Sequence, residues 1–170
     1  MSFLSRIFGE RDQRRRLLPL YEAIVAEARD PAWYRDGAVP DTVDGRFNMV
    51  TAVMALTLLR LEAEGQRTAP DSALLAELFV DDMDASLRQI GIGDFVVGKH
   101  VGKMMGALGG RLGAFRDADD LIEPVRRNVF HDAPPSPDAL GFVAARLERL
   151  RAALAATQPD ALLAGTLPTP

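Results

Sequence analysis

The uncharged stretch from Phe47 to Leu59 reads FNMVTAVMALTLL and is the strongest indication of the fold. Apolar side chains would cover nearly every side of a helix built from it, which is typical of a helix buried in a core. The stretch is well short of the ~20 apolar residues that cross a bilayer. Asp44 can cap such a helix, and Gly65 follows Glu64 as glycines commonly follow helix ends. The sequence therefore predicts a central buried helix from Asp44 to Glu64.

The sequence on either side of this central helix also has helical periodicity. Apolar residues recur every three or four positions, and strand-like alternation is absent. Caps and breakers divide the periodic segments, so we expect further helices at about 17–28, 68–90, 95–117, 120–130 and from Ser136 onward. The predicted fold class is all-α, a compact single-domain bundle of five to seven helices.

The chain divides into three parts by composition. Residues 1–16 form a basic, partly apolar N-terminal segment, and residues 17–157 form the helical domain. Residues 158–170 contain three prolines, and we expect a disordered tail there.

The composition of the 170 residues narrows the classes of function. The chain has no cysteine, which excludes disulfides, thiolate metal sites and a cysteine nucleophile. Its net charge of −4 opposes a dedicated nucleic-acid binder. Phosphate-binding loops and nucleophile motifs are absent from the sequence, so we expect a protein that is not an enzyme and has no cofactor. The N-terminus lacks the apolar run of a secretory signal, so we expect a cytoplasmic protein.

The N-terminal segment combines apolar and basic residues. Four large apolar residues would share one face of a helix, and five arginines lie beside them: Phe3, Leu4, Ile7 and Phe8, with Arg6, Arg11, Arg14, Arg15 and Arg16. Such a pattern favours peripheral contact with an anionic membrane surface. The alternative is a disordered tail that happens to be basic.

Three acidic residues, Asp81, Asp82 and Asp84, form a cluster in the predicted helix at 68–90. Asp82 falls on the apolar face of that helix, where a carboxylate needs a partner. We expect an ion pair with an arginine, Arg46 or Arg111. The alternative is a magnesium site in a metal-dependent all-α enzyme acting on diphosphate or phosphate substrates.

Five glycines recur at 4-4-3-4 spacing in the helix predicted at 95–117, which places them on one face: Gly98, Gly102, Gly106, Gly109 and Gly113. Each costs about 0.8–1 kcal/mol relative to alanine inside a helix. Small residues allow another backbone to approach closely. Two interpretations stay open, a partner helix packed on this face or a neighbouring helix of the same chain. The candidate partner-binding residues are Lys99, Lys103, Met104, Gly98, Gly102 and Gly106.

The last predicted helix carries apolar residues at 3-4-3-4 spacing, at Leu140, Val143, Leu147, Leu150 and Leu154. This spacing predicts packing against the bundle. The alternative is a homodimer formed along the same seam.

Several short motifs resemble the ubiquinol–cytochrome c chaperone family. They are VPDTVDGRF at 39–47, LFVDDMDASLR at 78–88, GIGD at 91–94, VGK at 97–99, Lys103-Met104 and Gly110-Arg111, within a resemblance that spans about residues 17–120. The residues that carry it include Asp41, Asp44, Gly45, Arg46, Phe47, Asp82, Asp84, Arg88, Gly91, Gly93, Asp94 and Arg111. Asn48 stands where the family usually has Asp.

The resemblance implies an all-α, non-catalytic assembly chaperone for the respiratory cytochrome bc complex. Its client would be newly synthesised cytochrome b, held while the complex is assembled. Other assembly factors or the ribosome would be further partners, and the protein would act peripherally at the cytoplasmic membrane.

Overall fold

The structure is a computed structural model that describes residues 3–89, 94–131 and 134–170. Its long helices are α1 (Phe3–Ala28), α3 (Val43–Glu62), α4 (Ala69–Gln89), α5 (Asp94–Arg116) and α7 (Pro137–Ala156). Short helices α2 (Pro31–Arg35), α6 (Ile122–Asn128) and α8 (Pro159–Leu163) and the 3₁₀ turn η1 (Gly65–Arg67) connect or end them. These residues contain no strand, and the predicted all-α class is confirmed.

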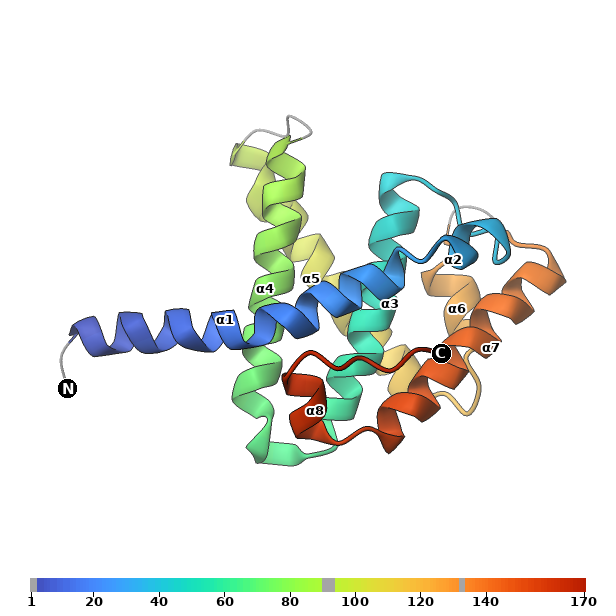
Figure 1. Cartoon of the computed structure of the whole chain (residues 1–170). Helices are drawn as coiled ribbons and strands as arrows, with labels where there is room; N and C mark the ends of the chain where they lie inside the picture. The colour runs from blue at the N-terminus through green and yellow to red at the C-terminus, as the bar shows by residue number, and fades with distance from the viewer. Residues whose placement is uncertain (1–2, 90–93, 132–133) are drawn as a thin grey trace.

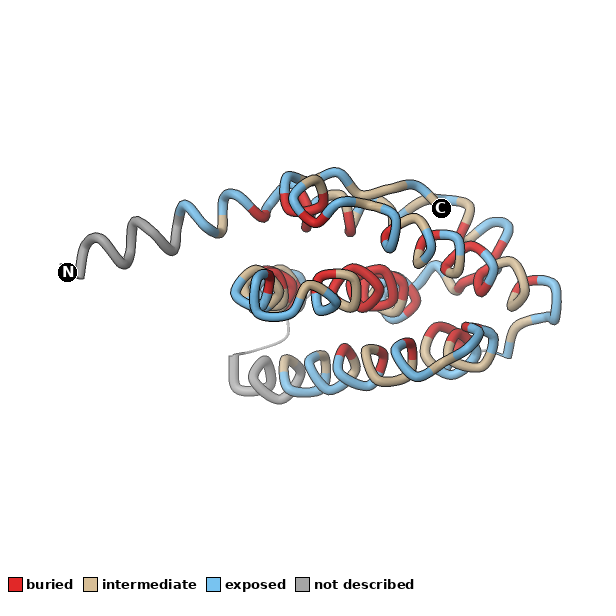
Figure 2. Tube along the Cα trace, turned by 90° about the horizontal axis from the view of Figure 1, so that it is seen from below, coloured by how far each residue is buried: buried red, intermediate tan, exposed pale blue. Residues whose placement is uncertain are grey.

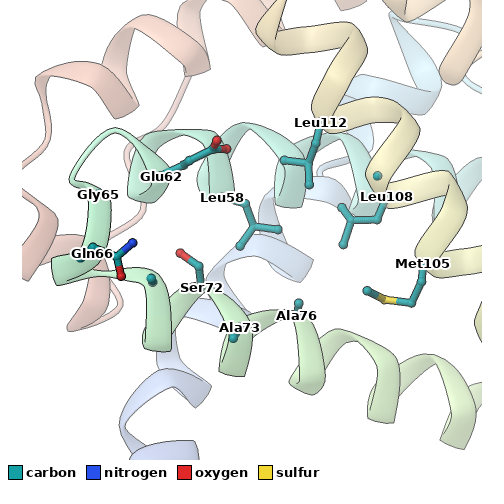
Figure 3. Close-up of a pocket in the computed structure, with 12 residues that line it drawn as sticks. Leu58, Glu62, Gly65, Gln66, Ser72, Ala73, Ala76, Met105, Leu108 and Leu112 are labelled. Atoms are coloured by element: carbon teal, nitrogen blue, oxygen red, sulfur yellow. The ribbon is translucent and has the colours of Figure 1, made fainter.

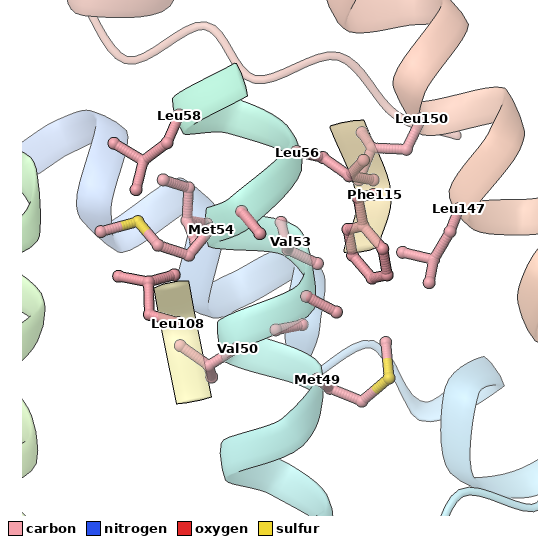
Figure 4. Close-up of a cluster of buried hydrophobic side chains, with 14 of the residues drawn as sticks. Met49, Val50, Val53, Met54, Leu56, Leu58, Leu108, Phe115, Leu147 and Leu150 are labelled. Carbon is pink, nitrogen blue, oxygen red and sulfur yellow. The ribbon is translucent and has the colours of Figure 1, made fainter. Parts of the chain in front are cut away.

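The predicted central helix corresponds to α3, which packs against α1, α4, α5 and α7. Every residue from Met49 to Leu58 is buried. Figure 4 shows Leu108 of α5 on one side of this stretch, and Phe115 of α5 with the leucines of α7 on the other. Its two threonines satisfy their hydroxyls by donating to backbone carbonyls within the helix, so burial leaves them paired.

The helices lie in layers around α3 and α4. α1 crosses one side of this pair and α5 covers the other (Figures 1 and 2). None of the described helices combines the length and the apolar character that a membrane span requires.

Local signals at the helix starts were partly predicted. Ser136 caps α7 as expected, and its hydroxyl accepts a hydrogen bond from the backbone N–H of Ala139 at 3.2 Å. For α3 the cap is Thr42 rather than Asp44, which lies in the first turn. A Cβ at Gly45 would lie 1.9 Å from the carbonyl oxygen of Pro40, so only glycine fits this helix start.

The predicted disordered tail at 158–170 is wrong. Residues 159–163 form α8, which packs against α1 and buries Leu162 and Leu163. Gly165 has φ +98°, and a Cβ there would lie 2.6 Å from the Cβ of Pro19. A positive φ and a close approach both require glycine, so this residue allows the chain end to lie along α1.

Two further boundaries differ from expectation. α1 continues without a break from the basic N-terminal segment into the domain and through Pro19, so the disordered alternative for that segment is wrong from residue 3 onward. The predicted loop at 30–42 contains α2, capped by Asp30, and the side chain of Trp33 is fully buried there.

The apolar residues spaced 3-4-3-4 along α7 pack against other helices of the same chain. Val143, Leu147, Leu150 and Leu154 are buried, and α7 packs against α3 and α6. Packing against the bundle is therefore confirmed, and a homodimer formed along this seam is excluded.

Candidate functional site

α4 and α5 lie side by side, as the short connection between them predicts (Figure 1). The turn that joins them lies outside the described residues, and with it Gly91 and Gly93. Asp94 begins α5, while Gly98 and Lys99 lie in its first two turns, and the side chains of this part are outside the description.

The glycines in the described part of α5 face open space. An ideal Cβ built at Gly102, Gly106, Gly109 or Gly113 meets no atom within 4 Å apart from its own surroundings in the helix. For these four positions the interpretation that a neighbouring helix of the same chain fills the glycine face is wrong. The alternative, a face left open for a partner, remains.

A cavity of about 480 Å³ lies beside this face, where the end of α3, the start of α4 and the middle of α5 meet (Figure 3). We call it the α4–α5 groove. Small residues of α4 and apolar residues of α5 line it: Ala69, Ala73 and Ala76, with Met105, Leu108 and Gly109. The groove is mostly apolar, with Glu62, Gln66 and Ser72 as its polar lining residues.

The predicted partner-binding residues of α5 differ in how far they are exposed, and those with described side chains do not line the groove. Lys103 is exposed on α5, whereas Met104 is half-buried and packs against the core. The neighbouring Met105, which the sequence analysis did not select, is 38% exposed and reaches the groove. The three alanines of α4 were also missed, although their 4-3 spacing is visible in the sequence.

The acidic cluster is divided among different partners. Tyr21 of α1 donates its hydroxyl hydrogen to Asp82 at 2.6 Å, so the predicted arginine partner is wrong. Burial, followed by the Asp82 carboxylate, raises the pKa of the Tyr21 hydroxyl. Asp84 pairs with Arg88 at 2.9 Å. Asp81 forms an ion pair with Arg14 of α1.

The metal-enzyme alternative lacks support in this arrangement. Within residues 3–89, 94–131 and 134–170, no three histidine or acidic side chains are grouped so that they could hold a metal ion. The two arginines considered as partners of Asp82 lie elsewhere. Arg46 bonds to Asp41 at 2.6 Å, and Arg111 lies among α3, α5 and α6.

Two arginines of the basic N-terminal segment bind α4. Arg14 pairs with Asp81, and Arg16 pairs with Asp71. The N-terminal half of α1 extends beyond the bundle in Figure 1. Arg15 between them is exposed, so part of the basic character of this helix stays accessible.

The motif at 39–47 is a packing motif in this structure. The rings of Phe47 and Phe79 are 6.1 Å apart, which joins α3 to α4. The guanidinium of Arg111 lies 5.9 Å from the centre of the Phe47 ring. These contacts fix the start of α3 against the two helices that border the groove.

Arg111 is buried at 5% exposure and holds three elements together. It donates to Asn48 Oδ1 at 2.6 Å, to the Ala107 carbonyl at 3.1 Å and to the Asn128 carbonyl. Its Nε is buried without a hydrogen-bond partner among the described residues. Burial lowers the pKa of the guanidinium to about 10.

Fold and groove together define an all-α protein with an open apolar groove on its surface. The family model described as ubiquinol–cytochrome C chaperone matches residues 35–169, and the chain belongs to that family. The match extends past the C-terminal limit of the resemblance noted in the sequence.

The solved structures support the same assignment. The crystal structure of the Cbp3 homolog from Brucella abortus is similar to this chain, with a TM-score of 0.78 and 31% sequence identity. The similarity covers 98% of this chain and 96% of that one. No curated protein matches the sequence.

Proposed function

We propose that this protein is an assembly chaperone that binds newly synthesised cytochrome b at the membrane surface and supports assembly of the cytochrome bc complex. Membership of the ubiquinol–cytochrome c chaperone family supports the chaperone role. The observation that carries the binding role is the open apolar groove beside bare glycines on α5. The apolar helices of such a client could lie against this surface.

The client-binding surface in this proposal centres on α5. Gly98, Gly102 and Gly106 provide close backbone approach, while Lys99 and Lys103 provide charge for polar loops. Met104 supports the surface from its half-buried position on the same helix. Other assembly factors or the ribosome are further candidate partners.

A crosslinking experiment tests the client. A photoreactive amino acid replaces Lys103 in the full chain, and the matched control replaces Arg149, an exposed residue of α7. We expect cytochrome b to be captured at position 103 in membranes that are synthesising the complex, and much less at 149. Absence of cytochrome b at position 103, or equal capture at both positions, would contradict the proposal.

The same proposal places the protein peripherally on the cytoplasmic membrane through the N-terminal part of α1. Deletion of residues 2–12 retains Arg14 and Arg16 and therefore their ion pairs with α4. The full chain should co-sediment with phosphatidylglycerol liposomes and the shortened chain should not, because anionic lipid attracts arginine-rich amphipathic helices. Unchanged co-sedimentation after the deletion would rule this contact out.

A further inference from the structure

The α4–α5 groove has small residues on both of its sides. Ala69, Ala73 and Ala76 of α4 line the groove, and so does Gly109 of α5; Figure 3 labels Ala73 and Ala76 on α4. The bare face of α5 continues from Gly102 to Gly113, a length of about 16 Å at the rise of an α-helix. Of these glycines only Gly109 lines the groove, beside the side chains of Met105 and Leu108, and the bare face continues from there along α5 as a surface on which another helix can lie.

The groove presents almost no charge to its occupant. The only charged side chain among its described lining residues is Glu62, which pairs with Arg116 at 2.7 Å. A charged amphipathic helix would leave its own charges unpaired here, and burying an unpaired charge is unfavourable. An uncharged, apolar helix has no such cost.

One polar group in the groove is left without a partner. The hydroxyl oxygen of Ser72 is buried and makes no hydrogen bond to any described residue. Figure 3 shows the Ser72 side chain directed from α4 into the groove, toward the side of Leu58. A hydroxyl in this position can donate to a carbonyl or hydroxyl oxygen of an incoming helix. Such bonds between small polar residues are common where apolar helices pack in membranes.

A second copy of the chain does not supply this helix from its described surface. The large apolar side chains that are well exposed, Leu18, Val43, Met105 and Ile122, belong to separate helices and form no stripe. The apolar face of α7 is buried in its own bundle.

We infer that the α4–α5 groove binds one uncharged apolar α-helix, of the kind that spans a membrane, packed closely against Gly109 of α5 and the alanines of α4. The inference rests on the proposed function for the source of that helix, the client. It adds that the occupant of the groove is a single uncharged helix and that the Ser72 hydroxyl becomes paired when this helix binds.

The test fills the groove without changing the rest of α5. Gly109→Leu places a side chain in the groove, and the matched control Gly110→Leu adds the same side chain at the next position, which is open and does not line the groove. Both replace an exposed helical glycine, so both should keep the fold. Ala73→Leu, with Ala85→Leu as its exposed control, fills the groove from α4 and serves if either glycine variant unfolds.

The probe is a fluorescent synthetic helix of about 20 leucine and alanine residues in mild detergent, mixed with the full chain. Gly109→Leu should weaken its binding by about tenfold, while Gly110→Leu should change it by less than about twofold. An amphipathic peptide of the same length with lysine and glutamate on one face should bind more weakly than the apolar peptide. Equal binding by the two leucine variants, preference for the charged peptide or no binding by the wild type would overturn the inference.

Capture of cytochrome b from membranes separates this inference from the proposed function. If the wild type and Gly109→Leu capture cytochrome b equally, the groove inference fails and the proposed function stands. If the wild type captures none, the proposed function fails, and the peptide measurement alone decides whether the groove binds apolar helices.

Discussion

The two faces of α5 differ in what covers them. Toward α3, Leu108 and Phe115 are 2% and 1% exposed and pack among the leucines of the core (Figure 4). On the other face, Gly106 and Gly109 meet nothing beyond their own helix. The first face is explained by the packing that stabilises the chain. The second face carries a cost in helix propensity that no contact of the described chain offsets.

This difference separates stability from binding along a single helix. Substitutions on the covered face should lower the free energy of unfolding. Substitutions on the open face should raise the free energy of unfolding or leave it unchanged. Their main effect should be on the affinity for a partner.

The largest effect is expected for Phe115→Ala on the covered face. The ring lies near Leu147 and Leu150 of α7 in Figure 4, and its removal leaves a cavity between α5 and α7. We expect a loss of about 3–5 kcal/mol in the free energy of unfolding, measured by urea denaturation. Ile122→Ala, at an exposed position, should cost much less, and a similar loss for both would show that the ring is not part of a tightly packed core.

The next prediction concerns Arg111, a buried cation on the covered side whose described partners are an amide and two carbonyls. Asn48→Asp places a carboxylate at the oxygen that now lies 2.6 Å from the Arg111 Nη2. We expect a gain of about 1–2 kcal/mol at neutral pH, because hydrogen bonds between charged groups are stronger than neutral ones. The size is limited by desolvation of the new carboxylate and by loss of the Asn48 bond to the Val129 carbonyl.

The pH dependence of the stability gained by Asn48→Asp tests whether the new carboxylate pairs with Arg111. Arg111 would depress the folded-state pKa of the carboxyl introduced by Asn48→Asp below its unfolded value, so the gain should be present above the unfolded pKa and lost as the pH falls through the folded one. Urea denaturation from pH 7 to pH 3, compared with the wild type, measures it. In an Arg111→Met background the substitution should no longer stabilise, and an undiminished gain there would refute the pairing.

On the open face, Gly106→Ala should stabilise the chain by about 0.8–1 kcal/mol, because alanine is the better helix former and its Cβ meets nothing within 4 Å. Gly45→Ala is the opposing control, since its Cβ would collide with the Pro40 carbonyl and lower stability. Thermal unfolding of both variants gives the signs. A loss of stability for Gly106→Ala would mean that the glycine face is packed inside the chain.

Sequence alone predicted the parts of the fold that depend on local signals. The apolar run of α3 and the Ser136-Pro137 start of α7 are set by neighbouring residues, so their patterns were sufficient. The tail and α2 were missed because their order comes from distant contacts. Leu162 and Leu163 bury themselves against α1, and Trp33 donates a hydrogen bond to the Glu27 carbonyl at 2.8 Å.

In the candidate site, too, the local features could be predicted from the sequence, and the features that depend on distant contacts could not. The glycine spacing on α5 is a property of one helix and is visible in the sequence. Whether that face is open depends on how α4 crosses α5, and so does the role of Met105. The partner of Asp82 could not be read either, because Tyr21 approaches it only when α1 lies across α4.

The smallest effect is expected for Ser72→Ala, and it tests the open side most directly. The substitution removes a buried hydroxyl without a partner among the described residues and replaces it by a better helix former, so the free chain should gain about 0.5–1 kcal/mol. Ser86→Ala, exposed on the same helix, should gain only the propensity difference. Binding of the apolar helix should weaken by about threefold for Ser72→Ala and stay constant for Ser86→Ala, because only the first hydroxyl can reach an occupant. If Ser72→Ala is the less stable of the two variants, the hydroxyl already has a partner within the chain, and its orientation into the groove no longer argues for an incoming helix.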